Sequence, residues 1–370
     1  MCIRDRNECG EKMKNKIGLI TFHRSTNFGS CLQAFALYKK IEMMGYQCEI
    51  IDYRCPAIEA RENLTVPQIS LFKPKSVYHR LFLWPTLKRK ANNLEIYLAN
   101  HAKISEEYTP DTITFANENY GKFLVGSDIV WGRDITNNDY VYFLDFVSND
   151  HKKYAFSASA GDYSIRGDEE KVGELLKSFS RIAVREKETI QWVKNLSSKE
   201  AEWVCDPTML LTAEEWKELI PPTKILDNYV LVYFDSPDHK CLKDAIKYGK
   251  EHNKKVFYID YYRKQMSGVI QKKPTTLNDF LGLIKSADRI FTASYHGILF
   301  SIYFEKQFVF YTRAHKSRVL SLAEKLDFLE QCGDSNNTVY DLDYKRITNK
   351  VADFRNQSIK SLMEILNDEA

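Results

Sequence analysis

Polar residues follow six apolar runs in this sequence, and they are the first candidates for chemistry. In an open parallel α/β sheet, the loops after the strands gather free N–H groups and the positive ends of helix dipoles. Small, amide and charged residues placed there predict a site for a polar, anionic ligand. The six segments are Asn27-Phe-Gly29 after 17–22, Gly126-Ser127-Asp128 after 123–125, Ser157-Ala-Ser-Ala-Gly161 after 154–156, Arg185-Glu186 after 181–184, Asp206-Pro207-Thr208 after 201–205, and Ser294-Tyr295-His296-Gly297 after 289–292.

His296 is the candidate for proton transfer, because an imidazole can take up and release a proton near neutral pH. It stands between a predicted strand and a predicted helix, and Gly297 beside it permits close approach of the backbone. A histidine that caps the helix or is satisfied within the core would occupy the same position. Both interpretations remain open from the sequence.

The other polar residues also have structural alternatives. Arg185 ends an apolar strand, and an ion pair with the adjacent carboxylates would explain it as well as a ligand would. Asn27 and Gly29 are typical of turns and helix N-caps. Asp206 precedes a proline, as at many turn openings, and Asp128 could cap or hold a loop.

Several sequence signatures of other sites are missing. No GxGxxG follows a strand and no GxxxxGK[ST] loop occurs, so neither a dinucleotide site nor a nucleoside triphosphate loop is indicated. HExxH, a histidine-rich cluster and GxSxG are missing as well. The eight cysteines form no CxxC pair and follow no secretory signal, which favours reduced, cytosolic, mostly buried thiols over disulfides or zinc.

Length and charge set the outer limits. A chain of 370 residues suits two domains of about 150–200 residues. A formal net charge of +3 is too small to indicate a nucleic-acid partner. The longest apolar stretch, 298–304, is far shorter than the roughly 20 residues of a membrane-spanning helix, so we expect a cytoplasmic protein. The sequence gives no indication of oligomeric state.

The elements that must position these residues alternate between strand and helix, which is typical of parallel sheets. Residues 1–16 carry no periodic pattern and are interpreted as a disordered leader or a sequence artefact. We predict an N-terminal Rossmann-like domain over 17–220 with an insertion at 54–121, and a second such domain over 224–340. An amphipathic helix over 345–370 is expected to pack back on the first domain.

The insertion contains a basic and aromatic segment at 71–84, followed by Lys88-Arg-Lys90. One interpretation is a surface that meets an anionic lipid-linked acceptor at the inner membrane face. The alternative is a set of helices with a solvated basic face.

Taken in order, these motifs resemble the polysaccharide pyruvyl transferase family over residues 17 to about 330. A single motif would be weakly specific, but their shared order is specific. The matching segments are His23-Arg-Ser-Thr-Asn27-Phe-Gly-Ser-Cys-Leu-Gln33, Ile51-Asp-Tyr53, Phe123-Leu-Val-Gly-Ser-Asp128-Ile-Val-Trp131, Tyr154-Ala-Phe-Ser157, Val184-Arg-Glu-Lys187, Asp206-Pro-Thr-Met-Leu-Leu211, and Thr292-Ala-Ser-Tyr-His-Gly297.

The resemblance implies a fold like the two-domain GT-B glycosyltransferases, with two Rossmann-like α/β domains facing across a cleft. It implies phosphoenolpyruvate as donor, whose pyruvyl group becomes a ketal on two sugar hydroxyls as phosphate leaves. The acceptor would be a saccharide or lipid-linked oligosaccharide, a precursor of a bacterial cell-surface or exopolysaccharide. Neither a cofactor nor a metal is needed.

Enol ether chemistry needs a proton for the methylene carbon and a base for the incoming hydroxyl. On this scheme His296 is the acid and base, Arg185 and the helix start after His296 hold phosphate or carboxylate, and Asp128 orients a sugar hydroxyl. The residues assigned to substrate binding are Asn27, Gly29, Ser127, Ser157, Asp206, Ser294, Tyr295 and Gly297.

The sequence departs from the family pattern at two positions: Ile129 stands where a glutamine is usual, and Tyr295 where phenylalanine is common. Two other classes of function remain open. One is a nucleotide-sugar glycosyltransferase of the same fold, and the other is a non-catalytic binding protein.

Overall fold

The computed structural model describes residues 16–62, 83–161, 167–261, 266–313, 316–335 and 341–368. The described residues fall into two compact units. The first draws on Met1–Glu62, Glu95–Leu210 and Asp353–Ala370, and the second on Asn63–Leu94 and Leu211–Ala352. The predicted leader at 1–16, except Lys16, and most of the basic segment at 71–84 lie outside the described residues.

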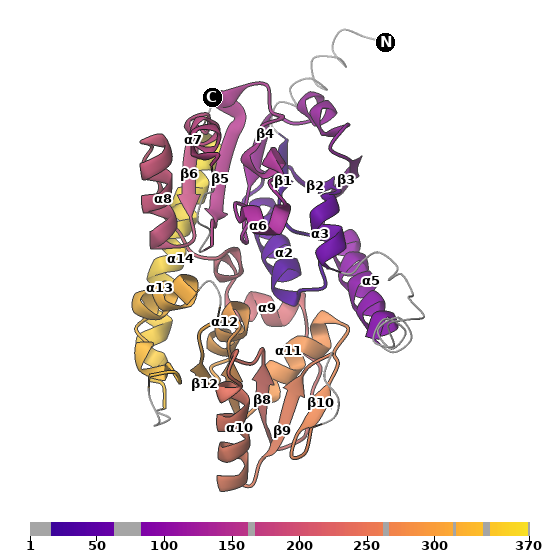
Figure 1. Cartoon of the computed structure of the whole chain (residues 1–370), viewed down its shortest axis with the longest axis vertical. Helices are drawn as coiled ribbons and strands as arrows, with labels where there is room; N and C mark the ends of the chain where they lie inside the picture. Colours follow the sequence, from indigo (N-terminus) through magenta and orange to yellow (C-terminus); the bar gives the residue numbers. More distant parts are fainter. Residues whose placement is uncertain are drawn as a thin grey trace. The chain divides into compact units, whose positions relative to one another are not determined.

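The first unit is built on a seven-stranded sheet in which every pairing is parallel, in the order β3-β2-β1-β4-β5-β6-β7 (Figure 1). Its strands are β1 Ile17–Ile20, β2 Cys48–Tyr53, β3 Ile104–Tyr108, β4 Lys122–Val125, β5 Lys153–Ala158, β6 Arg181–Val184 and β7 Glu202–Trp203. Its helical segments are α2 Phe28–Met43, α3 Pro56–Arg61, η2 Ile113–Glu118, α6 Arg133–Thr136, η3 Tyr140–Phe143, η4 Asp150–Lys152, α7 Glu169–Lys177, α8 Lys187–Ser197 and η5 Pro207–Leu210. Two longer helices, α5 Trp84–His101 and α14 Tyr344–Asn367, contribute residues to both units.

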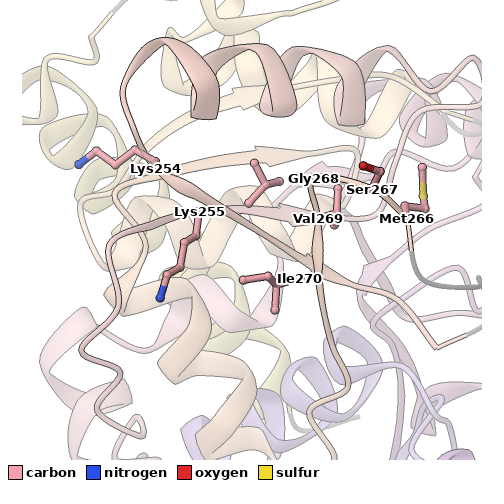
Figure 2. Close-up of a pocket in the computed structure, with 8 residues that line it drawn as sticks. Lys254, Lys255, Met266, Ser267, Gly268, Val269 and Ile270 are labelled. Atoms are coloured by element: carbon pink, nitrogen blue, oxygen red, sulfur yellow. The ribbon is translucent and has the colours of Figure 1, made fainter.

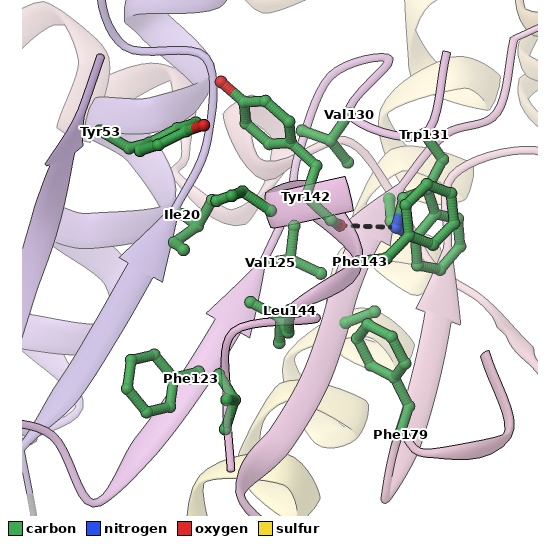
Figure 3. Packing of buried hydrophobic residues seen from close by; sticks show 14 of the residues in the cluster. Ile20, Tyr53, Phe123, Val125, Val130, Trp131, Tyr142, Phe143, Leu144 and Phe179 are labelled. Atoms are coloured by element: carbon green, nitrogen blue, oxygen red, sulfur yellow. Dashed lines mark hydrogen bonds between the residues drawn. The ribbon is translucent and has the colours of Figure 1, made fainter. Parts of the chain in front are cut away.

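Aromatic packing fills one side of this sheet (Figure 3). Trp131 is fully buried, stacks on Phe143 at 5.7 Å between ring centroids, and meets Phe179 edge to face. The Trp131 indole N–H donates to the carbonyl of Tyr142 at 3.0 Å. This packing holds the loop that follows β4, where Asp128 lies.

The second unit contains a five-stranded, all-parallel sheet in the order β10-β9-β8-β11-β12. Its strands are β8 Tyr229–Tyr233, β9 Lys255–Ile259, β10 Ile270–Lys272, β11 Arg289–Thr292 and β12 Gln307–Phe310. The helical segments beside them are α9 Ala213–Leu219, α10 Lys240–Glu251, α11 Leu277–Ser286, α12 Tyr295–Tyr303, α13 Lys316–Leu326 and η6 Leu329–Gln331.

Alternate residues of the central strand β8 show which helix covers which face, because successive strand side chains point to opposite faces. Val230 and Val232 share one core cluster with residues of α10. Tyr229 and Tyr233 contact α11 instead, through a hydrogen bond and a ring contact. Helix α12 contacts α11 and therefore lies on the same face, opposite α10.

Two parallel sheets, each with its own helices, confirm the predicted α/β fold with two Rossmann-like domains. The segment at 54–121, interpreted from the sequence as an insertion, also supplies the edge strand β3. Its Ile-Ser-Glu-Glu-Tyr sequence lacks the apolar run of a central strand, because an edge strand is only partly covered.

None of the helices in the described ranges is long and apolar enough to cross a membrane.

Candidate active site

In the first domain, Asn27 and Gly29 form the start of α2. The Asn27 side-chain oxygen accepts the Gly29 N–H at 2.9 Å, so Asn27 is the N-cap of this helix. The next residue, Ser30, is buried and donates to Asp128 Oδ2 at 2.6 Å. Helix α2 therefore holds the loop that follows β4 from its first turn.

The loop after β4 is fixed at both of its polar residues. The Ser127 N–H donates to the buried Gln33 side chain at 3.2 Å. Asp128 has a φ of 72°, and its Oδ1 accepts the N–H of Ile129 at 2.9 Å. With Ser30 on Oδ2, both carboxylate oxygens of Asp128 have fixed donors, and the side chain points in one direction.

Arg185 lies at the centre of a buried ion-pair network. Its Nε donates to Glu186 Oε1 at 2.8 Å, its Nη1 donates to Asp206 Oδ2 at 2.9 Å, and its Nη2 lies 3.9 Å from Asp128 Oδ1. The Arg185 side chain is 0% exposed. One guanidinium thus faces three carboxylates, so the ion-pair alternative for Arg185 describes this structure, and a phosphate here would meet an excess of negative charge.

Asp206 and Ser157 complete the strand-end set of the first domain. Asp206 Oδ1 accepts both the N–H and the hydroxyl of Thr208, at 2.9 and 2.7 Å, so it also holds the turn before η5. Ser157, the last residue but one of β5, has a φ of 56° and is fully buried, and its Oγ has no hydrogen-bond partner among the described residues. The neighbouring Ala158 pairs with Asp128, which joins the two strand ends.

In the second domain, the segment 294–297 forms the start of α12. Ser294 is the N-cap, and its Oγ accepts the Gly297 N–H at 3.2 Å. A Cβ on residue 297 would lie 2.6 Å from Thr292 Oγ1 and 3.0 Å from the Tyr233 ring, so glycine allows the helix to approach the sheet this closely. Thr292 in turn donates to the Tyr233 carbonyl and accepts the Ser294 N–H.

His296 occupies the first turn of this helix and is 7% exposed. Its ring meets the Tyr295 ring edge to face, at 5.5 Å and 83°. The Arg318 guanidinium carbon lies 5.9 Å from the centroid of the Tyr295 ring. No acidic residue stands in the first turn of α12, so the positive end of its dipole is not neutralised from within the helix.

The sequence profile of the family described as polysaccharide pyruvyl transferase matches residues 27–315. The chain belongs to the polysaccharide pyruvyl transferase family. The matched range contains every predicted site residue from Asn27 to Gly297. No curated protein matches the sequence.

Among solved structures, the chain is similar to three bacterial and archaeal UDP-GlcNAc 2-epimerases. The enzyme from Methanocaldococcus jannaschii is 12% identical with a TM-score of 0.47, over 91% of this chain and 92% of that one. The enzyme from Neisseria meningitidis is 8% identical with a TM-score of 0.46, over 94% and 100%. The enzyme from Rickettsia bellii is 10% identical with a TM-score of 0.45, over 96% and 98%.

This pyruvyl transferase family member carries one polar network that our sequence reasoning did not assign to a site. Arg24 makes two hydrogen bonds to Asp52, at 2.6 and 2.7 Å, and the His23 ring bonds Asp52 Oδ1 at 3.0 Å. Burial alone would raise the pKa of Asp52, but the hydrogen bonds from Arg24 and His23 outweigh it and hold that pKa well below its usual range. A His-Arg pair after the first strand and an aspartate late in the second were the available signal.

The departure at position 129 has a structural consequence in this family member. Ile129 is buried and belongs to the core cluster of the first domain. One of its methyl carbons would meet a Cβ on Gly132 at 2.5 Å, so the turn after it is tightly packed. Position 129 therefore contributes packing here, where a glutamine would contribute hydrogen bonds.

An open groove of about 580 Å³ lies elsewhere in the second domain (Figure 2). It is lined by Lys254, Lys255, Met266, Val269 and Ile270, among others. Lys255 begins β9 and Ile270 begins β10, so the groove lies at the amino ends of parallel strands. The candidate residues all lie at the carboxyl ends, where ligands of open α/β sheets bind.

Within the described residues, no group of three or more His, Cys, Asp or Glu could hold a metal ion.

Proposed function

We propose that this family member transfers the pyruvyl group of phosphoenolpyruvate onto two hydroxyls of a sugar, forming a ketal and releasing phosphate. The observation that carries the proposal is the family match over residues 27–315, which includes both His296 and Asp128 with their supporting loops. The proposed acceptor is a saccharide or lipid-linked oligosaccharide that becomes part of a bacterial cell-surface or exopolysaccharide. Such an acceptor would put the reaction at the cytoplasmic face of the inner membrane.

The donor chemistry assigns a role to the second domain. The methylene carbon of phosphoenolpyruvate must gain a proton as the carbon bearing the phosphate oxygen is attacked. We assign this proton to His296. The positive end of the α12 dipole and the guanidinium of Arg318 supply a positive field for the donor's phosphate and carboxylate.

The acceptor chemistry assigns a role to the first domain. Asp128 has donors from Ser30 and Ile129 on its two oxygens, so its remaining lone pairs have a fixed direction. A carboxylate held in this way can accept a hydrogen bond from a sugar hydroxyl and orient it. Arg185 contributes by balancing the charge of Asp128 and its neighbours, and we assign it a positioning role instead of a phosphate contact.

The test is a comparison of donors. The purified protein is incubated with phosphoenolpyruvate and a panel of methyl glycosides of common hexoses and N-acetylhexosamines, and both phosphate release and the ketal methyl signal in NMR are followed. A parallel series replaces phosphoenolpyruvate with UDP-glucose, UDP-galactose and UDP-GlcNAc, and UDP release is followed. We expect phosphate and ketal only in the first series. UDP release with sugar transfer would assign the protein to nucleotide-sugar glycosyltransferases.

A further inference from the structure

A second histidine in the C-terminal domain is held by a buried carboxylate. The His239 Nδ1 bonds Asp235 Oδ2 at 2.6 Å, and the side chains are 51% and 3% exposed respectively. Asp235 follows the central strand β8 by two residues. The imidazole is thus held at the carboxyl end of that strand by a buried carboxylate, whose other oxygen accepts the Leu242 N–H.

Capping of helix α10 does not explain His239. The first N–H groups of this helix are accepted by other side chains: that of Lys240 by Asp238, that of Cys241 by Ser236, and that of Leu242 by Asp235. His239 is the N-cap residue, yet its own side chain makes no capping bond.

The backbone of His239 is also unusual. Its φ of 62° and ψ of 17° lie in the left-handed region, which only a few per cent of non-glycine residues adopt. Non-glycine residues held in this region concentrate at functional sites. Loop 235–239 therefore presents an oriented, half-exposed imidazole, although the left-handed backbone at His239 is unfavourable in conformational free energy.

The sheet topology puts this pair at the position where ligands bind. The chain leaves β8 through α10 toward β9 on one side, and leaves β11 through α12 toward β12 on the other. In open α/β sheets the ligand crevice lies where the strand order reverses in this way. Because α10 and α12 cover opposite faces, His239 and His296 stand at helix starts on the two sides of the switch point between β8 and β11.

Ketal formation includes two proton transfers, and two imidazoles can carry them out. The first hydroxyl oxygen bonds to C2 of the donor while C3 gains a proton, and the second hydroxyl oxygen bonds to C2 as the bond from C2 to the phosphate oxygen breaks. Each hydroxyl loses one proton, and of these two protons one ends on the new methyl group and the other on the departing phosphate. A proton is therefore removed at one atom while another is delivered elsewhere, which two separate imidazoles can do in the same step.

We propose that His239, oriented by Asp235, is a second proton-transfer residue, which takes one hydroxyl proton and returns it to the leaving phosphate, while His296 delivers its proton to C3 and takes up the other hydroxyl proton. This inference rests on the proposed pyruvyl transfer. Asp235 is a positioning residue that acts through His239.

The test compares His239→Asn with His252→Asn. Asparagine tolerates the left-handed backbone at 239 but transfers no proton. His252 is the matched control, because it lies just after the other end of α10, where its ring stacks on Tyr248 and bonds the Tyr248 carbonyl. Turnover is measured with phosphoenolpyruvate and the methyl glycoside panel, donor affinity by calorimetry, and folding by thermal unfolding.

We expect His239→Asn to lower kcat by about 10²–10⁴-fold with donor affinity and Tm nearly unchanged, and His252→Asn to match the wild type. Asp235→Asn keeps an oxygen for the Leu242 N–H but loses the carboxylate, and should lower kcat by roughly 10-fold to 100-fold. The double variant should be no slower than His239→Asn, because both changes remove one function.

Equal kcat for His239→Asn and His252→Asn, in a wild type that consumes phosphoenolpyruvate, would overturn this inference alone. Additive losses in the double variant would overturn the role of Asp235. A wild-type protein that releases no phosphate from phosphoenolpyruvate would overturn the proposed function and this inference with it.

Discussion

Arg185 and His296 occupy comparable strand ends in the sequence, but their surroundings in the structure differ. The Arg185 guanidinium is enclosed by three carboxylates and has no exposed surface. His296 stands in the first turn of a helix without acidic residues there, and its ring meets that of Tyr295, which the Arg318 guanidinium approaches. The two residues should therefore respond to substitution in different ways, one mainly in stability and the other mainly in turnover.

For His296 we predict a loss of turnover with little loss of stability. Asparagine retains a hydrogen-bonding group but cannot donate a proton to the methylene carbon, so His296→Asn should lower kcat by about 10²–10⁴-fold. Donor affinity, measured by calorimetry, should change far less than kcat. A variant that unfolds many degrees earlier would show that His296 mainly holds the loop, and a stable variant with full activity would refute proton transfer.

For Arg185 we predict a loss of stability. Lysine keeps the charge but cannot reach three carboxylates, and disruption of this buried network should cost about 2–3 kcal/mol, or roughly 4–12 °C in Tm. Calorimetric affinity for phosphoenolpyruvate should be unchanged at a temperature where the variant is folded. A selective loss of donor affinity at wild-type Tm would return Arg185 to the phosphate-binding role.

Among the secondary-structure elements, α12 depends on one glycine for its position against the sheet. Gly297→Ala would place a Cβ 2.6 Å from Thr292 Oγ1, so the first turn of the helix must shift away from β11. We expect a destabilisation of about 1–3 kcal/mol in chemical denaturation, together with reduced turnover because His296 is in the same turn. Ser294→Ala is the comparison: it removes the cap bond, worth about 1 kcal/mol, without adding a Cβ against the sheet. Equal stability of Gly297→Ala and the wild type would show that the contact is easily relieved.

The ends of β1 and β2 are joined by a network that should depend on pH. The pKa of Asp52 is lowered in the folded protein, so its contribution to stability is present above its unfolded value near 4 and is lost as the pH falls below it. We predict that Tm falls more steeply between pH 5 and 3 in the wild type than in Arg24→Gln, by an amount equivalent to at most about 1 kcal/mol. Parallel Tm curves for the two proteins would contradict this assignment.

At the scale of the whole molecule, both domains bury the cysteines of the described residues. The six cysteines within the described residues are free and buried. Burial raises the pKa of Cys31 to about 12, and burial is also the largest cause that raises the pKa of Cys205 to about 12. Since the thiolate is the reactive form, these cysteines should be inert while the domains are folded.

This leads to a prediction for the intact chain. Ellman's reagent at pH 8 should leave the six cysteines of the described residues unreacted in the native protein, and should titrate all eight thiols in guanidinium chloride. The same experiment tests the expectation of reduced cysteines. Fewer than eight thiols after unfolding without reductant would indicate a disulfide, and rapid native reaction of more than two would indicate that a domain opens.

The sequence by itself determined the features that depend on local pattern. Alternating apolar runs predicted the two parallel-sheet domains, and the polar residues after each run marked the loops that carry Asp128, Arg185 and His296. The N-caps Asn27 and Ser294 were foreseeable for the same reason, since a cap bonds a backbone group only two or three residues away. The short edge strand β3 was not predicted, because an edge strand lacks the apolar run of a central one.

Only the tertiary structure decided what these residues touch. Asp128 and Asp206 reach Arg185 because β4, β6 and β7, which these residues follow, lie in one sheet, and no local pattern specifies that neighbourhood. The histidines 239 and 296 follow the neighbouring strands β8 and β11 at the carboxyl-terminal edge of the second sheet, although the chain leaves these strands in opposite directions. Strand order brings together residues far apart in the chain, and that order is fixed by packing of the whole sheet. The sequence could therefore indicate which loops carry the candidate residues. It could not indicate which of these residues contact one another.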